Sequence, residues 1–526
     1  MFAKSDIWLA LLVALFAFAA SVFVADGRPQ LGPDGANALH SAQNLAHGEG
    51  LSSKIIGTQS TLQPQAVITK PPLYPYTIAA LIKLGVAPKA AGWIIEQLSF
   101  AFAAGLLYLL ARRVLPWGPA LLAGALFSMQ MSGLRWSMNV HEEWLFIALT
   151  FFSLLVFSVL RERGATGLRW GWVLLGVISA AAVLTSYPGV ALVMTIGLLL
   201  LAAVARKQLP AQALLLYLFG VAVAGLPPLL RFVSLWAGGL RPSFDEGAQP
   251  TWFPIAAGLT STFQVDFAGR LLFWLYDPTT LAMFAIVGAF VLVAALLFAA
   301  SRHRNLRPVA LYIAIYLLVV VVQLAASGKA AFEPRYALPV EGLLLLLGVA
   351  LAWRWSQHER RFLRMTSIIL SMLAVAVFVS GQVHKFREFD VFPTGVKSSR
   401  EYCPAPQTIA WIKQHIPAGA AVMGTQCTYQ LIAESSDYYW LPIPPADEYA
   451  SSPRYHERWQ EADLLRISRS SNAKWIVLLS GDKGDPYADK PGYGEFVGQL
   501  LGGSAGTARI KLAARFSDGM VYRIDE

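Results

Sequence analysis

Residues Leu31–Leu73 read LGPDGANALHSAQNLAHGEGLSSKIIGTQSTLQPQAVITKPPL, a long polar stretch in an otherwise apolar chain. The stretch follows one apolar run of 19 residues, Ile7–Ala25. About 20 apolar residues cross a bilayer as a helix. The core of a signal peptide is shorter than this run, so we expect a retained first transmembrane helix. The polar stretch then belongs to a first loop, residues 26–91, between membrane helices.

The composition of the whole chain is that of a polytopic membrane protein. Of its 526 residues, 56% are hydrophobic and 14% are charged, whereas soluble domains carry about 25% charged residues. The formal net charge is +10. Residues 1–384 contribute +11 and residues 385–526 contribute −1. The basic excess lies mainly in short loops between apolar segments, which indicates membrane topology and no nucleic-acid partner.

Eleven segments are predicted to span the membrane. Tyr74–Val86 is not one of them, because it is short and contains Lys83, which favours a helix at the membrane interface. The predicted spans are Ile7–Ala25, Gly92–Ala111, Pro116–Gly133, Trp144–Leu160, Gly171–Ser186, Val190–Ala205, Ala211–Leu230, Leu281–Ala300, Val309–Ala326, Ala337–Trp353 and Thr366–Val383.

The orientation follows from the distribution of lysine and arginine between the short loops. One set of loops holds 15 of them, and the opposite set holds three: Arg135, Lys329 and Arg335. Basic loops stay in the cytosol, so the N-terminus is predicted to be cytosolic. With eleven spans, the C-terminus lies outside, together with the polar stretch. The fold class is therefore a mainly α polytopic membrane protein, with a transmembrane domain (residues 1–384) and an extracytoplasmic C-terminal domain (residues 385–526).

The C-terminal domain is predicted to be a small α/β domain. Pro406–Ile416 has a helical pattern, and four segments have the β-branched and aromatic content of strands: Ala420–Gln426, Lys474–Leu479, Ile510–Phe516 and Met520–Ile524. The chain has two cysteines, Cys403 and Cys427, both in this domain. A disulfide between them is one interpretation if the domain faces an oxidising compartment, and two unrelated thiols are the other.

Asp34 and Lys70 are the candidate functional residues of the polar stretch. Asp34 precedes a helical pattern, Ala36–His47, so it is either the helix N-cap or a general base at the membrane surface. Lys70 begins Lys-Pro-Pro-Leu, in which the prolines stiffen the backbone. A lysine held in this way suits a phosphate headgroup as a point charge, and simple snorkelling to the interface is the alternative.

Two further polar motifs begin predicted spans on the same outer side. His141, Glu142 and Glu143 precede the fourth span, and acidic residues so close to hydrocarbon tend to be functional. Their alternative role is to start a helix favourably. A divalent metal at His141 is conceivable, but no second histidine cluster supports it, so no metal or cofactor is predicted. Arg335 and Tyr336 precede the tenth span, as a phosphate or carboxylate contact or as an interfacial anchor.

Arginines of the outer loops are weaker alternatives for binding an anion. They are Arg231, Arg241 and Arg270. His40 and His47 lie seven residues apart in the helical pattern, and we expect them to line one helix face without binding metal.

Four features in this order resemble the C-type membrane glycosyltransferases, and especially bacterial members of the protein-mannosyltransferase and lipid A aminoarabinose-transferase group. The first is an initial span followed by an Asp-containing loop whose helix ends in Gly-Glu-Gly (Gly48–Gly50). The others are Lys-Pro-Pro-Leu, a Glu-Trp-Leu-Phe start of a later span (Glu143–Phe146) and Arg-Tyr-x-x-Pro (Arg335–Pro339). The resemblance covers about residues 1–350.

The resemblance implies inverting transfer of a sugar from a polyprenyl-phosphate donor to an extracytoplasmic acceptor at the bacterial inner membrane. By resemblance, Asp34 is the catalytic base, Lys70 binds the donor phosphate, and Arg335 is a second phosphate contact. Glu143 matches the later acidic position better than Glu142, because it precedes Trp-Leu-Phe. One departure is Gly35, where many relatives have an acidic residue.

Three functions remain open at this point. A glycosyltransferase is the main hypothesis. A transporter or flippase of a lipid-linked sugar would require broken helices in corresponding halves and charges near the bilayer midplane. A non-enzymatic assembly partner would use the outer domain as a binding module. The sugar, the polyprenyl chain and the acceptor, whether lipid, protein or cell-envelope polymer, stay undetermined.

Overall fold

The computed structural model of the protein describes residues 2–25, 31, 33–54, 65–67, 71–163, 169–237, 294–295, 297–327, 334–357, 405–424, 437–442, 461–479 and 509–525, with a few positions between 359 and 376. Several predicted features lie outside these residues. They are Lys70, Arg241, Arg270, Cys403, Cys427, most of the predicted spans Leu281–Ala300 and Thr366–Val383, and the boundary between the two predicted domains.

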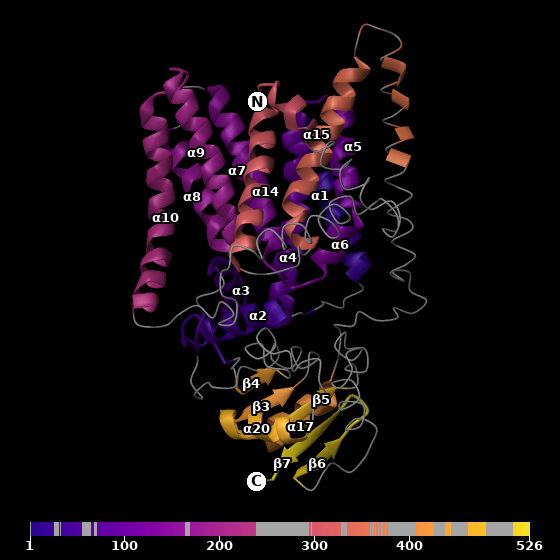
Figure 1. Ribbon diagram of the computed structural model, residues 1–526. Coiled ribbons are helices and arrows are strands. Elements are labelled where there is room, and N and C mark those ends of the chain that lie inside the picture. The colour runs from indigo at the N-terminus through magenta and orange to yellow at the C-terminus, as the bar shows by residue number, and fades with distance from the viewer. Residues whose placement is uncertain are drawn as a thin grey trace.

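A bundle of apolar helices forms the larger part of the molecule (Figure 1). Among the described residues, six helices are long and apolar enough to cross a membrane: α1 (Lys4–Ala25), α4 (Pro88–Arg112), α7 (Glu143–Arg163), α9 (Val190–Ala205, preceded by the 3-10 turn η2, Tyr187–Gly189), α10 (Ala211–Ala237) and α15 (Leu338–Ser356). Three further apolar helices are α5 (Trp117–Ser128), α8 (Arg169–Thr185) and α14 (Arg307–Ser327). The mainly α membrane fold is confirmed, whereas the number of eleven spans stays a prediction.

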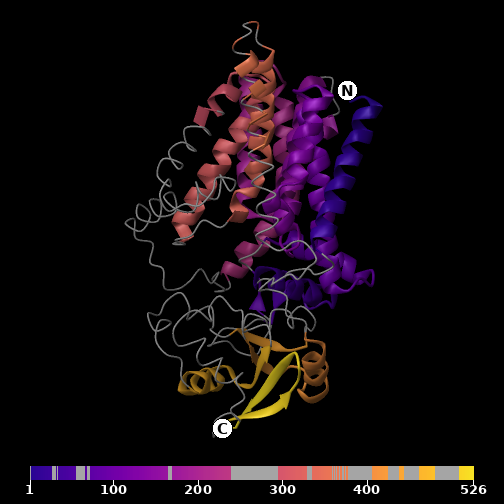
Figure 2. The same cartoon turned by 90° about the vertical axis from the view of Figure 1, so that its right-hand side faces the viewer.

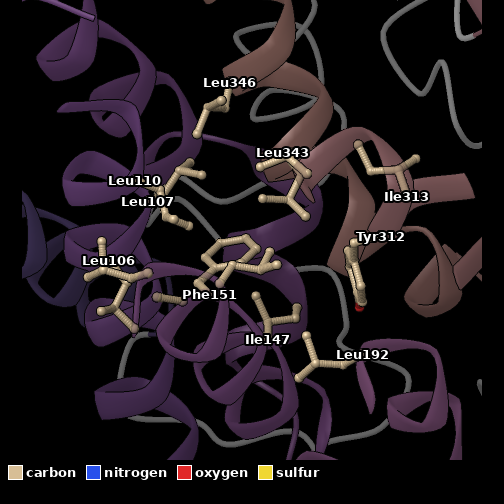
Figure 3. Packing of buried hydrophobic residues seen from close by; sticks show 14 of the residues in the cluster. Leu106, Leu107, Leu110, Ile147, Phe151, Leu192, Tyr312, Ile313, Leu343 and Leu346 are labelled. Carbon is tan, nitrogen blue, oxygen red and sulfur yellow. The ribbon is translucent and has the colours of Figure 1, made fainter. Parts of the chain in front are cut away.

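Large aliphatic and aromatic side chains fill the centre of the bundle (Figure 3). Leu107 of α4, Ile147 and Phe151 of α7, and Leu343 of α15 are fully buried there. Lipid tails are as apolar as these side chains, so removal from water does not drive such contacts inside a membrane. Close van der Waals packing therefore holds the helices together.

Helices α8 and α10 approach each other closely at two glycines. A Cβ atom on Gly176 would collide with the backbone carbonyl oxygen of Tyr217, and one on Gly220 with that of Val173. Small residues at helix contacts let membrane helices pack backbone to backbone. The two glycines thus permit this contact between α8 and α10, because neither has a side chain.

Polar contacts distinguish the two ends of the bundle. At the end near the N-terminus, Arg112 Nε donates to Asp6 Oδ1 over 2.7 Å, and Arg113 pairs with Glu162. At the opposite end lie the polar insert and the C-terminal domain (Figures 1 and 2). The described parts of the polar insert and of the C-terminal domain, which were predicted to share one side, therefore lie at the same end of the bundle. Which end faces the cytosol stays a prediction.

The predicted span Pro116–Gly133 is not one helix. Helix α5 ends at Ser128, and a separate short helix, α6 (Met131–Ser137), begins after Gln130. The backbone of Gln130 is extended, with ψ of 119°, and its side-chain amide donates to the carboxylate of Glu341 in α15. Gln130, whose side chain contacts α15, thus lies at the break between α5 and α6. Hydropathy alone did not reveal the break.

The polar insert forms short elements between the bundle and the C-terminal domain (Figure 1). They are α2 (Pro33–Ala46), the strands β1 (Ser52–Ser53) and β2 (Gln65–Ala66), and α3 (Leu73–Lys83). With 11 residues, α3 extends about 16 Å and is too short to span a bilayer. The prediction of a short non-spanning helix after Lys-Pro-Pro-Leu is therefore confirmed.

The C-terminal domain contains a five-stranded mixed sheet with the strand order β4-β3-β5-β7-β6. Strand β3 is parallel to β4 and β5, and β7 is antiparallel to β5 and β6. The elements are β3 (Ala421–Gly424), β4 (Tyr439–Pro442), β5 (Ala473–Leu479), β6 (Ile510–Arg515), β7 (Gly519–Ile524), α17 (Pro406–His415) and α20 (Glu461–Ser471). The predicted helix and four strands are confirmed, whereas β4 and α20 were missed.

Candidate functional site

Asp34 lies in the first turn of α2, which begins at Pro33. Proline suits the first helical position because its fixed φ matches the helix and it has no N–H to satisfy. A carboxylate in this turn is favoured by the helix dipole. The interpretation of Asp34 as the N-cap is wrong, since the helix starts one residue before it. The side chain instead reaches a residue 301 positions away, Arg335.

Gly35 brings α2 against the chain segment that precedes α7. A Cβ atom on Gly35 would collide with the carbonyl oxygen of Val140, so a larger residue here would push the two segments apart. Val140 is fully buried and is followed directly by His141. The acidic residue that the resemblance led us to expect at this position would therefore collide with Val140. The close approach places Asp34 beside the His141–Glu143 motif.

Arg335 is the centre of the candidate site. Its Nη1 donates to Asp34 Oδ2 over 2.6 Å and lies 3.6 Å from Glu143 Oε1. The same nitrogen lies 3.4 Å from His141 Nδ1. A guanidinium has only N–H donors, so this histidine nitrogen accepts. One buried cation thus joins three segments that are far apart in the sequence. Arg335 is buried, and whether it serves as a phosphate contact or as an interfacial anchor stays a prediction.

Aromatic side chains fix the backbone around Arg335. Arg335 and Tyr336 belong to the 3-10 turn η4 (Pro334–Tyr336), and the guanidinium carbon lies 5.4 Å from the centre of the Tyr336 ring. Tyr316 of α14 donates its hydroxyl to the carbonyl of Tyr336 over 3.1 Å. The Tyr316 ring also stacks on Phe146 of α7, with centroids 6.2 Å apart. Helices α7 and α14 therefore position η4, and cation–π attraction adds to the hold on Arg335.

His141, Glu142 and Glu143 satisfy the geometry of a metal-ligand group. One ligand atom from each lies within 4.8 Å of the others, and no other group of this kind occurs among the described residues. Imidazole and carboxylate are ordinary ligands of divalent metals. However, Arg335 already approaches both His141 and Glu143. A metal ion between these side chains would repel Arg335, so the residues fit a metal only with this arginine displaced.

Glu96 of α4 is a buried acid that the sequence reasoning missed. Its side chain is fully buried. The hydroxyl of Tyr74, the backbone N–H of Trp144 and the carboxyls of Glu142 and Glu143 all act on it electrostatically. An acid within an apolar span is rare and is a functional hypothesis by default. That signal was visible in the predicted span Gly92–Ala111.

Tyr74 links this buried acid to the end of the Lys-Pro-Pro-Leu motif. It follows Leu73 at the start of α3, and its side chain is buried. Burial raises the pKa of Tyr74 well above its usual value, and the carboxyls of Glu96, Glu142 and Glu143 raise it further. The hydroxyl therefore stays protonated at all physiological pH values. The described chain that follows Lys70 thus leads directly to the acidic group.

Other candidates lie away from this cluster. Arg231 Nη2 donates to the carbonyl of Leu51 over 3.1 Å, so it contacts the insert and not Arg335. His40 is fully buried, whereas His47 is exposed beyond the end of α2. The two histidines therefore do not line one helix face as expected.

Comparisons with known proteins give a family match for part of the chain and a shared fold. Residues 69–230 match the family described as dolichyl-phosphate-mannose-protein mannosyltransferase. No curated protein matches the sequence. Among solved structures, ArnT from Cupriavidus metallidurans bound to undecaprenyl phosphate is 15% identical, with a TM-score of 0.52 over 99% of this chain and 98% of that one. In the apo state, ArnT gives a TM-score of 0.54 at 14% identity over the same shares.

An archaeal protein shares the fold as well. It is the oligosaccharyltransferase AglB from Archaeoglobus fulgidus in complex with an inhibitory peptide and a dolichol-phosphate. It is 12% identical, with a TM-score of 0.51 over 93% of this chain and 72% of that one. The chain is therefore a membrane protein with the fold of the C-type glycosyltransferases, and its residues 69–230 match the mannosyltransferase family.

Proposed function

We propose that the protein transfers a sugar from a polyprenyl-phosphate donor to an acceptor on the extracytoplasmic face of the bacterial inner membrane. The acceptor is a glycolipid, a protein or a cell-envelope polymer. The proposal draws on the fold, which this chain shares with structures containing undecaprenyl phosphate and dolichol-phosphate. The observation that carries it is the contact of Arg335 Nη1 with both Asp34 and Glu143 at one end of the bundle.

The reaction requires a base for the acceptor and cations for the leaving group. In the proposed step, the acceptor oxygen attacks the anomeric carbon of the sugar and its proton passes to Asp34. The bond between that carbon and the phosphate oxygen breaks, and the polyprenyl phosphate leaves with the electron pair. Lys70 and Arg335 stabilise the negative charge that grows on the phosphate. Attack from the face opposite the leaving group inverts the anomeric centre.

In this scheme, the Asp34 carboxylate and the donor phosphate compete for the guanidinium of Arg335. The guanidinium of Arg335 lies 2.6 Å from Asp34. A donor phosphate that attracts Arg335 would weaken this contact and leave the Asp34 carboxylate available to the acceptor hydroxyl. In the proposed scheme, Lys70 supplies a second cation for the donor phosphate.

The flippase alternative receives no support from the arrangement of charges. Asp34, Glu143 and Arg335 gather at one end of the bundle. A carrier that moves a charged headgroup across the membrane would be expected to hold its binding charges near the midplane.

A transfer assay tests the proposed function. Purified protein is incubated with a panel of polyprenyl-phosphate sugars and acceptor fractions, and Asp34→Asn is compared with wild type. Loss of the base should reduce kcat by about a hundredfold or more, which is the usual contribution of general base catalysis. Binding of the donor should persist in this variant.

Asp525→Asn is the matched control, because it makes the same isosteric change on the exposed surface of the C-terminal domain. The carboxylate of Asp525 contacts Lys511 at 2.7 Å and lies outside the candidate site. This control should retain full activity. Wild-type activity in Asp34→Asn would remove Asp34 from the mechanism, and absence of transfer from every donor by wild type would contradict the proposed function.

A further inference from the structure

Four arginines lie together at the end of the bundle opposite the candidate site. Arg161 is in the last turn of α7, and Arg206 follows the last residue of α9. Arg304 lies in the turn before α14, and Arg307 is the first residue of that helix. The other three arginines all act on Arg161 electrostatically. We call these four residues the arginine cluster.

Packing of the bundle holds the turn before α14 in place. Leu306 in this turn is fully buried in the apolar core, which also contains Leu160 of α7 and Ala203 of α9. Arg161 Nη1 donates to the backbone carbonyl of Arg304 over 3.4 Å. The turn is therefore fixed against the ends of α7 and α9, and its arginines lie close to Arg161.

No carboxylate of the described residues pairs with a member of the arginine cluster. Residues 300–308 contain three arginines and no aspartate or glutamate. Elsewhere at this end the chain does supply acids, because Arg112 pairs with Asp6 and Arg113 pairs with Glu162. The cluster therefore holds positive charges that the described part of the chain does not neutralise.

Helix dipoles account for only part of this arrangement. A cation is favoured at a helix C-terminus, which suits Arg161 and Arg206. Arg307 lies instead at the N-terminus of α14, where a cation is disfavoured and an anion is favoured. Arg304 also comes close to Arg161, although like charges repel each other. A bound anion would stabilise the four charges and the N-terminus of α14 together.

The surroundings of the cluster indicate a lipid as the source of the anion. The apolar helices α7 and α9 cross the membrane by their length and composition, and they end at the cluster. This places the cluster at the level of the lipid headgroups. Leu201 of α9 and Phe298, which precedes the turn, are exposed apolar side chains. Such side chains suit contact with acyl chains, whereas a soluble anion would gain nothing from them.

We propose that the arginine cluster binds the phosphate headgroup of an anionic phospholipid at the membrane surface opposite the candidate site. Guanidinium groups form charge-assisted hydrogen bonds with phosphate oxygens. Basic pockets between membrane helices bind the headgroups of anionic lipids in this way. The inference does not depend on the proposed function, because the cluster lies at the other end of the bundle and takes part in no step of sugar transfer.

Native mass spectrometry of the full chain in detergent tests the proposal, with phosphatidylglycerol and phosphatidylcholine as probes. Both lipids contain the phosphate, but only phosphatidylglycerol has a net negative charge. Wild type should bind phosphatidylglycerol with a Kd lower than that for phosphatidylcholine by about tenfold or more. Inorganic phosphate at the same concentrations should not displace the lipid.

Arg304→Gln is the decisive variant, because it neutralises an exposed side chain while the backbone carbonyl of Arg304 still accepts from Arg161. Each arginine near an anionic headgroup contributes about a fivefold gain in affinity. The Kd for phosphatidylglycerol should therefore rise about fivefold in Arg304→Gln and about 25-fold when Arg206→Gln is added. Arg304→Lys keeps the charge and should retain most of the affinity.

Arg169→Gln is the matched control. Arg169 begins α8, is exposed and is not among the residues that act on Arg161. This change also removes one positive charge, and it should leave the Kd nearly unchanged. Thermal unfolding without lipid tests for a folding defect. Arg304→Gln should unfold at the temperature of wild type or higher, because one repulsion is removed.

Three results would overturn the proposal. Equal affinity of wild type for the two lipids would contradict a headgroup site, and an acidic protein would then be the better partner for the cluster. Displacement of phosphatidylglycerol by inorganic phosphate would indicate a site for a soluble anion. Equal losses of affinity in Arg169→Gln and Arg304→Gln would show that the general positive charge of this end, and not the cluster, attracts the lipid.

Discussion

At the scale of the single residue, Arg335 is the cation that contacts the carboxylates of Asp34 and Glu143 in the candidate site. Its side chain is 9% exposed, while that of Asp34 is 30% exposed and that of Glu143 is 12% exposed. Desolvation of a buried ion pair can cancel its attraction, so the pair itself adds little stability. Removing one partner is different, because the remaining charge is then buried without compensation.

Arg335→Met should therefore lower both stability and activity. We expect a loss of about 2 kcal/mol in the free energy of unfolding, discounted for the partial exposure of Asp34. We also expect a decrease of about a hundredfold or more in kcat/KM, because a cation for the leaving group is lost. Thermal unfolding in detergent and the transfer assay measure the two effects.

The double variant Arg335→Met with Asp34→Asn separates these effects. Neutralising Asp34 removes part of the uncompensated charge, so stability should recover in part while activity stays low. Equal stability of the single and double variants would show that the negative charge of Asp34 costs no stability when Arg335 is absent.

Sequence reasoning predicted the residues of the cluster but not all of its contacts. Glu143 was named because acidic residues near hydrocarbon are costly, Asp34 as a general base just after a span, and Arg335 as an anion contact at the start of a span. Their pairing through one nitrogen depends on backbone positions that no local pattern encodes. Glu96 was missed although it lies in an apolar run, because the search considered the ends of the spans and not their interiors.

Helix α2 is the element whose packing determines the distance between Asp34 and the His141–Glu143 motif. Its Gly35 lies against the carbonyl of Val140 without room for a side chain. A polar helix pattern followed by Gly-Glu-Gly predicted the helix itself. Nothing in that pattern predicted which face would touch another segment, because the contact joins residues about a hundred positions apart.

Gly35→Ala should move α2 away from Val140. Overpacking of this kind costs about 1–3 kcal/mol, so we expect a lower unfolding temperature and reduced transfer activity. Gly197→Ala is the matched control in a helix, because a Cβ atom there meets nothing within 4 Å. That change should be neutral or slightly stabilising, since alanine favours a helix over glycine by about 1 kcal/mol. Equal effects of the two substitutions would contradict the close packing of α2.

At the scale of the whole molecule, the distribution of charge predicted which segments meet. Of the segments assigned to one side, the described ones that carry Asp34, Glu143 and Arg335 come together. Loop charges encode sidedness because loops rich in lysine and arginine stay in the cytosol. They carry no information on how helices pack, so the division of Pro116–Gly133 and the edge strand β4 had to come from the structure.

The absolute orientation is the last prediction, and it can be tested with fusions at the C-terminus. The end of the bundle opposite the candidate site carries Arg112, Arg113 and Arg161, and loops rich in such residues stay in the cytosol. The C-terminal domain should then lie outside. Alkaline phosphatase fused after Glu526 should be active, and green fluorescent protein at the same point should be dark.

Fusions after Lys207 provide the internal control, since this basic residue lies between α9 and α10 at the predicted cytosolic end. They should give the reverse result, with fluorescence and no phosphatase activity. Fluorescence from the fusion after Glu526 would place Asp34, Glu143 and Arg335 in the cytosol. The acceptor would then have to be cytosolic as well, and the proposed extracytoplasmic transfer would be wrong even if the site and its chemistry were right.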